Sequence, residues 1–305
     1  MSLHPSHKKI FNLHEIEEKN MTTRIHAIQT GLVRIKNAQR VRKPGGLLRV
    51  LTDTQWTEWL PIYAWVIDHP EGIIVVDTGE TAHSTKPGYF PGWHPYYRSA
   101  VRMDVKPEDE IGPQLKNMGI MPCDVKILIL THFHTDHAGG LSHFPESKIL
   151  VSGSDYRLAS SFSGKLLGYL PQRWPKWFAP QPVSFDRTAL GPFEQSYAVT
   201  QSGDVYIVPT PGHTPGHISV MVEHEDVTYF LAGDTSYNQR LLLKRVSDGV
   251  SPNENVTIDT LERINILAHS RPLVYLPSHD PQSARRLDVI ETVANQEKGK
   301  ERVYA

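Results

Sequence analysis

The segment THFHTDHAGG, residues 131–140, constrains the fold of this chain more than any other feature. An apolar run at positions 127–130 leads into it, as is typical of a buried strand. Four side chains with lone pairs follow within six residues: His132, His134, Asp136 and His137. Because unpaired polar groups are costly in a protein core, these side chains need a positively charged partner. The segment therefore predicts a buried strand that ends at a metal site.

Composition excludes several classes of protein. The 305 residues are 39% hydrophobic, enough for the core of one large domain. With 32 basic and 33 acidic residues, the chain lacks the basic surface that nucleic-acid binding usually requires. The single cysteine, Cys123, excludes an internal disulfide framework and a cysteine-rich zinc site. No apolar run reaches the ~18 residues of a membrane span, and the first 20 residues lack a signal-peptide core. We therefore expect a cytoplasmic protein with no nucleic-acid or membrane partner.

Hydrophobic periodicity predicts alternating strands and helices. Strands are expected at 23–35, 63–68, 71–77, 125–130, 205–210, 218–224, 227–233 and 272–278. Helices are expected at 106–119, 152–161 and 257–270, and long loops at 85–103 and 164–182. Strands followed by mixed strands and helices indicate α/β layers with the sheets inside. We expect one catalytic domain, residues 23–305, after an N-terminal extension at 1–22.

Three further metal-ligand residues each follow a predicted strand directly: His213, Asp234 and His279. Because functional sites of layered α/β folds gather at strand ends, the four loops should converge. Seven nitrogen and oxygen donors are too many for one tetrahedral zinc ion, but they suit two metals that share a bridging carboxylate. The spacing therefore predicts a dinuclear centre.

The motif of residues 131–140 resembles the His-x-His-x-Asp-His signature of the metallo-β-lactamase superfamily. TPGHTPGH, GDTSY and PSHD, at 210–217, 233–237 and 277–280, resemble its later motifs in the same order. The resemblance implies an αββα sandwich: two mixed β-sheets flanked by helices, with the site between the sheets. It further implies that one metal is held by His132, His134 and His213, that the second is held by Asp136, His137 and His279, and that Asp234 bridges them.

Within the superfamily, individual residues separate the branches. True β-lactamases usually have a cysteine where this chain has Asp234, and flavodiiron proteins have a glutamate where it has His134. Glyoxalase II carries a helical C-terminal domain, whereas only 26 residues (305 − 279) follow His279. N-acyl homoserine lactonases carry Asp-x-Ser-Tyr at the bridging position, and Tyr237 completes that pattern here. The chain therefore resembles these quorum-quenching lactonases.

The resemblance also implies a chemistry and a substrate. Two divalent ions, with zinc expected first and iron, cobalt or manganese as alternatives, lower the pKa of a shared water. Asp136 would orient this water and move its proton, and Tyr237 would donate a hydrogen bond to the carbonyl oxygen of a small-molecule lactone. The aromatic segment before the signature resembles the variable substrate loop of these lactonases, with Tyr89, Phe90 and Trp93 as substrate-binding residues. A homodimer is a further expectation.

Other interpretations remain open. The chain could hydrolyse another lactone, an ester or a glyoxalase II-like thioester, or be a mono-iron oxidoreductase of the persulfide dioxygenase kind. A metal-stabilised scaffold is the non-enzymatic alternative. Among single residues, Tyr237 could simply pack. The aromatic residues of the segment before the signature could be ordinary core or interface aromatics: Tyr89, Phe90, Trp93, Tyr96 and Tyr97. Asp77 is expected to bond a ligand imidazole. The remaining histidines of the region are expected at the surface: His83, His94 and His143.

Overall fold

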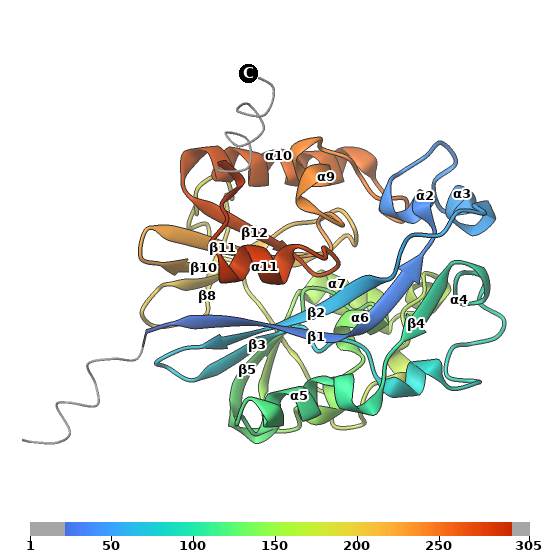
Figure 1. Ribbon diagram of the computed structural model, residues 1–305, viewed down its shortest axis with the longest axis horizontal. Helices are drawn as coiled ribbons and strands as arrows, with labels where there is room; N and C mark the ends of the chain where they lie inside the picture. The colour runs from blue at the N-terminus through green and yellow to red at the C-terminus, as the bar shows by residue number, and fades with distance from the viewer. Residues whose placement is uncertain (1–21, 295–305) are drawn as a thin grey trace, which may run out of the picture.

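The computed structural model describes residues 22–294. The predicted extension at 1–22 therefore lies almost entirely outside the described residues. Within them, two mixed β-sheets pack face to face and helices cover the outer face of each (Figure 1). The predicted αββα sandwich is confirmed.

The first sheet has seven strands in the order β4-β1-β2-β3-β5-β6-β7. Its first half is antiparallel, and β3, β5, β6 and β7 run parallel. The strands are β1 (Arg24–Ile35), β2 (Leu60–Asp68), β3 (Ile73–Val76), β4 (Val101–Asp104), β5 (Val125–Ile129), β6 (Lys148–Val151) and β7 (Gln181–Pro182).

The second sheet has five strands in the order β12-β11-β10-β9-β8. Only β11 and β12 are parallel, so their carboxyl ends lie at the same edge of the sheet. The strands are β8 (Tyr197–Ala198), β9 (Val205–Pro209), β10 (Ile218–His224), β11 (Val227–Gly233) and β12 (Leu273–Pro277).

The apolar runs that predicted strands have side chains on both faces of a sheet, which explains why they do not alternate with polar residues. In β3, Ile74 and Val76 point into the core between the sheets, whereas Val75 packs on the outer side. From the second sheet, Val220 and Leu231 meet them in the same inner core. Burial on both faces fixes the register of the strands that lead to the site.

Helices complete the outer layers. The longest, α10 (Glu254–Ser270), begins where the Asn253 side chain accepts hydrogen bonds from two backbone N–H groups of its first turn. Its apolar stripe of Leu261, Ile264 and Leu267 packs on the outer face of the second sheet. The other helices are α2 (Asn37–Arg40), α3 (Gly46–Thr52), α4 (Pro95–Ser99), α5 (Ile111–Asn117), α6 (Thr135–Ala138), α7 (Gly153–Ser160), α8 (Phe162–Leu166), α9 (Gln239–Leu243) and α11 (Ser283–Asp288).

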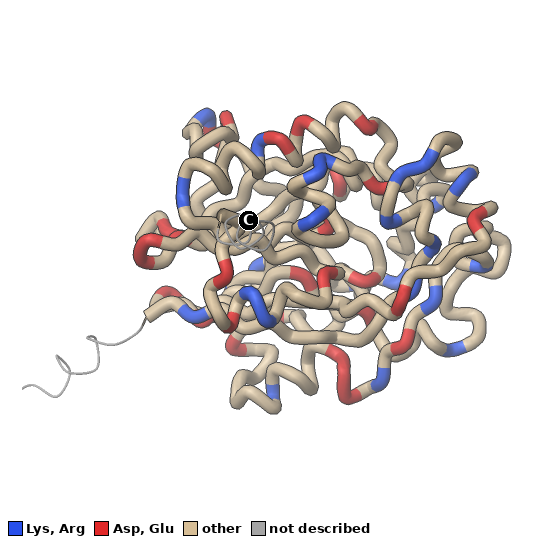
Figure 2. The backbone as a smooth tube through the Cα atoms, turned by 45° about the horizontal axis from the view of Figure 1, so that its top comes forward, with Lys and Arg blue, Asp and Glu red and all other residues tan. Residues whose placement is uncertain are grey.

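Charge and hydropathy agree with the composition. Lysine and arginine positions are interspersed with acidic ones along the backbone (Figure 2), as the formal net charge of −1 suggests. Between residues 22 and 294, no helix is long and apolar enough to cross a membrane.

Candidate metal centre

The loops after four strands meet at one end of the sandwich. His132 follows β5, His213 lies between β9 and β10, Asp234 follows β11, and His279 follows β12. Backbone bonds join the two sheets here, because Tyr63 of β2 donates to the carbonyl of Ser278 at 3.0 Å. The predicted convergence of the loops is confirmed.

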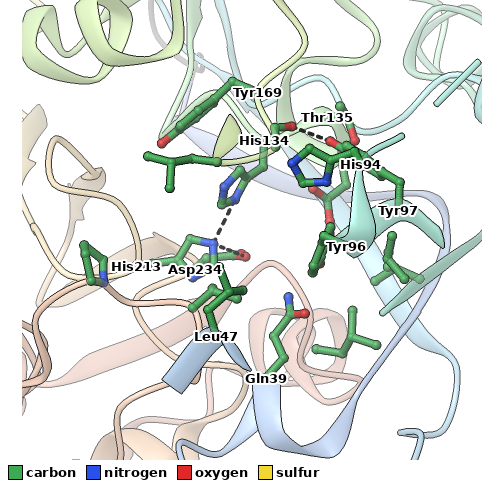
Figure 3. Close-up of a pocket in the computed structure, with 18 of the residues that line it drawn as sticks. Gln39, Leu47, His94, Tyr96, Tyr97, His134, Thr135, Tyr169, His213 and Asp234 are labelled. Carbon is green, nitrogen blue, oxygen red and sulfur yellow. Dashed lines mark hydrogen bonds and ion pairs between the residues drawn. The ribbon is translucent and has the colours of Figure 1, made fainter. Parts of the chain in front are cut away.

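Three ring nitrogens form the first cluster. His134 Nδ1 lies 3.0 Å from His132 Nε2 and 3.0 Å from His213 Nε2. Figure 3 shows the His134 ring pointing toward the side chain of His213. A neutral imidazole has a single N–H, so three ring nitrogens that face one another present more lone pairs than protons. Such a cluster is a ready set of ligands for a cation.

Asp136, His137 and His279 form the second cluster. His279 Nε2 lies 3.4 Å from Asp136 Oδ2 and 3.4 Å from Asp234 Oδ1. Asp234 reaches both clusters, because its Oδ2 lies 3.4 Å from His213 Nε2 and its Oδ1 lies 3.2 Å from His137 Nε2. The seven predicted side chains thus come together, with Asp234 between the two groups that the sequence predicted.

Hydrogen bonds on the far side of the rings aim the nitrogens at the centre. Because a carboxylate can only accept, Asp77 at 2.8 Å fixes the proton of His137 on Nδ1 and leaves Nε2 for the cluster. Asp248 holds His213 Nδ1 in the same way at 3.1 Å. His279 Nδ1 donates to the backbone carbonyl of Pro61 at 2.8 Å. The prediction that Asp77 bonds an imidazole of the motif is confirmed.

Asp77 also ties the motif to its neighbouring strand. Its φ of 61° lies in the left-handed region, which aspartate tolerates better than most residues. Its carboxylate accepts hydrogen bonds from the backbone N–H and the hydroxyl of Thr131, each at 2.8 Å. Gly140 closes the turn, because a Cβ atom there would lie 2.5 Å from the carbonyl oxygen of Thr78. The aspartate and the glycine thus hold the two ends of the motif against the turn that follows β3.

Electrostatics divides the buried imidazoles into two kinds. Burial lowers the pKa of His134 to about 3, and the neighbouring His213 adds to this effect. Burial opposes a charge on His137 as well, but Asp234 and Asp77 raise its pKa well above the usual value. Asp234 remains ionised despite burial, because His279 and His137 hold its pKa well below the usual range. The centre is thus a buried, ionised carboxylate beside both neutral and proton-binding imidazoles, and such a carboxylate favours positive charge next to it.

Two buried atoms indicate that a metal fits this centre. His137 Nε2 and Asp234 Oδ1 are 3.2 Å apart, yet neither makes a hydrogen bond of acceptable geometry. Buried polar atoms rarely lack partners in native proteins. Three triads within residues 22–294 could each hold an ion: His132, His134 and His213; His132, His137 and Asp234; and Asp136, His137 and His279. Nitrogen and carboxylate donors without cysteine suit zinc, iron, cobalt or manganese. Occupancy by two ions stays a prediction.

A cavity of about 150 Å³ adjoins the cluster. Polar side chains of the cluster form one part of its wall, including His134, Asp136 and Asp234. Apolar side chains form most of the rest: Val33, Ile35, Leu47, Val101, Met103, Leu158, Leu166, Leu167 and Val250. Figure 3 shows Tyr169 and His134 on one side of this cavity and Gln39 and Leu47 on the other. The site therefore suits a ligand with one polar end and an apolar remainder.

Tyr237 lies in the wall of this cavity beside the donor cluster. Its ring stacks on His279, with centroids 5.6 Å apart, and its hydroxyl accepts a hydrogen bond from Gln39 Nε2 at 2.9 Å. Burial, with Asp234 adding to the effect, raises the pKa of Tyr237 well above its usual value, so the hydroxyl keeps its proton. This position is compatible with the predicted hydrogen bond to a substrate.

The aromatic segment before the signature reaches the cavity through residues other than the three predicted. Trp93 is 61% exposed, Phe90 stacks on Tyr97, and Tyr89 borders a smaller cavity beside Arg173. The residues of this segment that line the large cavity are His94, Tyr96, Tyr97, Val101 and Met103. The segment is not one long loop as predicted, because α4 forms within it and turns the Tyr96 and Tyr97 rings inward.

The prediction that His94 lies at the surface is wrong. Its side chain is only 4% exposed, and its Nε2 lies 3.1 Å from the carbonyl oxygen of Leu166. This contact joins the aromatic segment to α8 and fixes one side of the cavity mouth. His83 is exposed as expected, and His143 is half-buried, with Nε2 2.8 Å from the carboxylate of Glu110.

Several residues of the site could not be identified from motifs. Asp248 supports His213 from an irregular segment 35 residues further along the chain. Tyr169 stacks on His134 from the segment predicted as a loop. His217 belongs to the quoted TPGHTPGH motif, and its Nε2 accepts the backbone N–H of Asp234 at 3.1 Å. Of these three, only His217 had a signal in the sequence.

Known proteins with similar sequences carry related names. An N-acyl homoserine lactonase of Rhizobium radiobacter, AttM, is 26% identical over 236 residues, covering 73% of this chain and 83% of that protein. An N-acyl homoserine lactonase of a Bacillus species is 28% identical over 236 residues, covering 74% of this chain and 84% of that protein.

Solved structures share the fold. An N-acyl homoserine lactone hydrolase, with N-hexanoyl-L-homoserine bound at its catalytic metal centre, aligns with a TM-score of 0.68. The two chains are 22% identical, and the alignment covers 87% of this chain and 96% of that one. A dizinc quorum-quenching lactonase aligns with a TM-score of 0.60 at 15% identity, covering 86% of this chain and 89% of that one. The profile of the metallo-β-lactamase superfamily matches residues 57–279. The chain therefore belongs to the metallo-β-lactamase superfamily.

Proposed function

We propose that this protein opens the lactone ring of N-acyl homoserine lactones, which would make it a quorum-quenching hydrolase. The observation that supports this most is the placement of seven metal-ligand side chains and the Tyr237 hydroxyl at the polar part of an otherwise apolar cavity. An N-acyl homoserine lactone is divided in the same way, since its lactone ring and amide are polar and its acyl tail is apolar. The names of the sequence relatives point in the same direction.

The cavity would orient such a substrate by its two ends. The lactone ring would lie at the donor cluster, where His134 and Asp136 line the wall. The acyl tail would extend over Leu47 and Leu166, which are about half exposed and line the cavity. Burial of apolar tail surface contributes about 25 cal/mol per Å², so the tail would add to binding without taking part in the reaction.

Two divalent ions, when bound by the seven residues, supply Lewis acidity and lower the pKa of water toward neutrality. Asp136 would accept a proton from the attacking water. A bond forms between the water oxygen and the carbonyl carbon, and the carbon–oxygen bond of the ring breaks. The leaving alkoxide takes the proton from Asp136, which gives an N-acyl homoserine.

Tyr237 would act on the carbonyl oxygen of the ring. Its O–H remains protonated in this buried position, so it can donate a hydrogen bond as negative charge develops on that oxygen. Because the ring of Tyr237 stacks on His279, the hydroxyl is held beside the donor cluster without rearrangement. A donor that is fixed in advance stabilises a transition state more effectively than one that must reorient.

A ring-opening assay tests the proposal. Protein with measured metal content is incubated with hexanoyl homoserine lactone, and the ring-opened product is followed by mass spectrometry and by proton release. We expect turnover that an Asp234→Ala variant loses. Hydrolysis of S-lactoylglutathione or a simple ester, without turnover of the lactone by fully metallated protein, would instead assign the site to another hydrolase of the superfamily.

A further inference from the structure

Gln39 reaches the cavity from α2, and backbone hydrogen bonds hold this helix beside the metal centre. Its side chain is 5% exposed and lines the cavity wall. Its backbone carbonyl accepts the N–H of Gly249 at 2.7 Å, and the N–H of Arg42 donates to the carbonyl of Ser247 at 2.9 Å. These two bonds flank Asp248, the residue that orients His213. The position of Gln39 relative to the donor cluster is therefore fixed by backbone contacts.

The carboxamide of Gln39 has one satisfied end and one free end. Nε2 donates a hydrogen bond to the hydroxyl oxygen of Tyr237 at 2.9 Å. Because Gln39 occupies a lone pair of that oxygen, the hydroxyl proton of Tyr237 is left to point elsewhere. Gln39 Oε1 is buried and has no hydrogen-bond partner. A buried carbonyl without a donor destabilises the fold, so its presence needs an explanation.

We propose that Gln39 recognises the amide of the substrate. Its Oε1 accepts a hydrogen bond from the N–H of the acylamino group, while its Nε2 positions Tyr237 for the ring carbonyl. This inference rests on the proposed lactonase function and extends it to the substrate class, lactones with an N–H on the carbon next to the carbonyl. Figure 3 shows the Gln39 side chain extending from its helix toward Tyr96, inside the cavity.

The covalent structure of the substrate agrees with this geometry. In an N-acyl homoserine lactone, the amide nitrogen is bonded to the carbon beside the ring carbonyl. The amide N–H, which needs an acceptor, therefore lies close to the ring carbonyl oxygen, which needs a donor. Gln39 Oε1 and the Tyr237 hydroxyl are neighbours as well, joined through a single carboxamide and one hydrogen bond. One rigid pair of side chains can thus contact both atoms.

The test compares two substrates that differ in one atom. The first is hexanoyl homoserine lactone, and the second is its ester analogue, in which oxygen replaces the N–H. Wild type should prefer the amide by about 10- to 100-fold in kcat/KM, because the ester presents a lone pair to Oε1. Gln39→Met has a similar volume and no acceptor, so its preference should fall to within about threefold. Ring opening is scored by the mass of each product.

Controls separate recognition from folding. Asn37→Ala lies on the same short helix, and its side chain is outside the cavity wall, so it should keep the wild-type preference. Metal content and thermal unfolding are measured for each variant. A Gln39→Met variant with wild-type preference for the amide would overturn the proposal.

Binding to the wild type gives a second readout that needs no variant. The ring-opened amide product should bind at least about tenfold more tightly than its ester counterpart, as measured by calorimetry. Equal affinities would overturn the role of Gln39 even if the variant fails to fold. Absence of lactone turnover by fully metallated wild type would overturn the proposed function itself, whereas turnover with no amide preference would overturn only this inference.

Discussion

The phenol ring of Tyr237 stacks on the imidazole of His279, with centroids 5.6 Å apart and planes inclined by 22°. Both residues follow strands of the second sheet, Tyr237 after β11 and His279 after β12. Because these strands run parallel, their carboxyl ends bring the two rings to one edge. The hydrogen-bond donor and the metal-ligand candidate therefore form one unit whose position the sheet determines.

Tyr237→Phe should reduce activity without emptying the metal centre. The substitution removes one hydroxyl and keeps the ring that stacks on His279. We expect kcat/KM for acyl homoserine lactones to fall by roughly ten- to several-hundred-fold, within the range for a lost oxyanion donor. Steady-state kinetics on short- and long-chain lactones measure this, with metal content determined in parallel.

The loss in Tyr237→Phe should be similar for every acyl chain, because the hydroxyl would contact the ring carbonyl and not the tail. Tyr206→Phe is a matched control, since its hydroxyl bonds the carbonyl of Gly203 and it does not line the cavity. Unchanged kinetics in the Tyr237 variant would exclude this residue from the mechanism.

Metal analysis should find about two ions per chain, since Asp234 lies between two clusters of donors. Asp234→Ala should weaken both sites, whereas His213→Ala should mainly affect the cluster with His132 and His134. Elemental analysis after dialysis against limiting chelator distinguishes these outcomes. A single tightly bound ion that added metal does not raise to two would contradict the dinuclear centre.

Asp248→Asn should weaken metal binding, although Asp248 is not one of the predicted ligands. The carboxylate holds the proton of His213 on Nδ1, and an amide in its place can donate to that nitrogen and shift the proton to Nε2. We expect metal affinity to fall by about 10- to 100-fold, as is typical when the partner of a ligand histidine is lost. Competition with a fluorescent chelator measures this affinity, and the exposed Asp226→Asn should match wild type.

The sequence was sufficient to predict eight of the twelve strands in the described part of the chain, including those that lead to the donor cluster, whereas β4, β6, β7 and β8 were not predicted. The runs before His132 and Asp234 are mostly apolar, with Lys126 and Thr228 as the polar residues of β5 and β11, which is the pattern of strands largely buried on both faces. Each run ends at a potential ligand, so the positions of the ligands followed from the strands. The segment 37–52 had no clear periodicity, and its two short helices, α2 and α3, were not predicted.

The remainder of the site depends on contacts between distant segments. Gln39 meets Tyr237 across 198 positions of sequence, and Asp248 meets His213 across 35. No local pattern marks such pairs, because they depend on how α2 and the 247–251 segment pack together. The same holds for His94, which the chain buries against α8 although its sequence neighbours are exposed.

A further prediction concerns a contact between the two sheets, His69 with Asp204, at the end of the strands that lies away from the metal centre. His69, just after β2, lies 3.0 Å from the carboxylate of Asp204, just before β9. Partial burial opposes the charge of Asp204, but hydrogen bonds from Thr200 and Ser202, together with His69, lower its pKa to about 2. The folded state therefore favours the ionised form more than the unfolded state does.

A depressed pKa of this kind stabilises the fold above the unfolded value, about 4, and this stabilisation is lost as pH falls toward 2. Because the side chain is 27% exposed, we discount the shift for screening and expect about 1–2 kcal/mol. Asp204→Asn should remove this contribution, so its free energy of unfolding should depend less on pH between about 4 and 2. Urea denaturation across that range measures the difference. If the free energy of unfolding of the two proteins depends on pH in the same way, the His69–Asp204 contact does not stabilise the fold as predicted.

Leu47 and Leu48 offer a test of the acyl-tail path, because they are adjacent on α3 and only Leu47 lines the cavity. Leu47→Ala removes apolar surface that a long tail would cover. We expect kcat/KM for dodecanoyl homoserine lactone to fall by roughly 3- to 10-fold, while that for the butanoyl compound changes little, since its tail is too short to reach α3. Leu48→Ala, with its side chain 69% exposed, should leave both values unchanged. Equal losses on the two substrates in Leu47→Ala would indicate a general disturbance of the site, and no loss on either would mean that the tail leaves the cavity by another side.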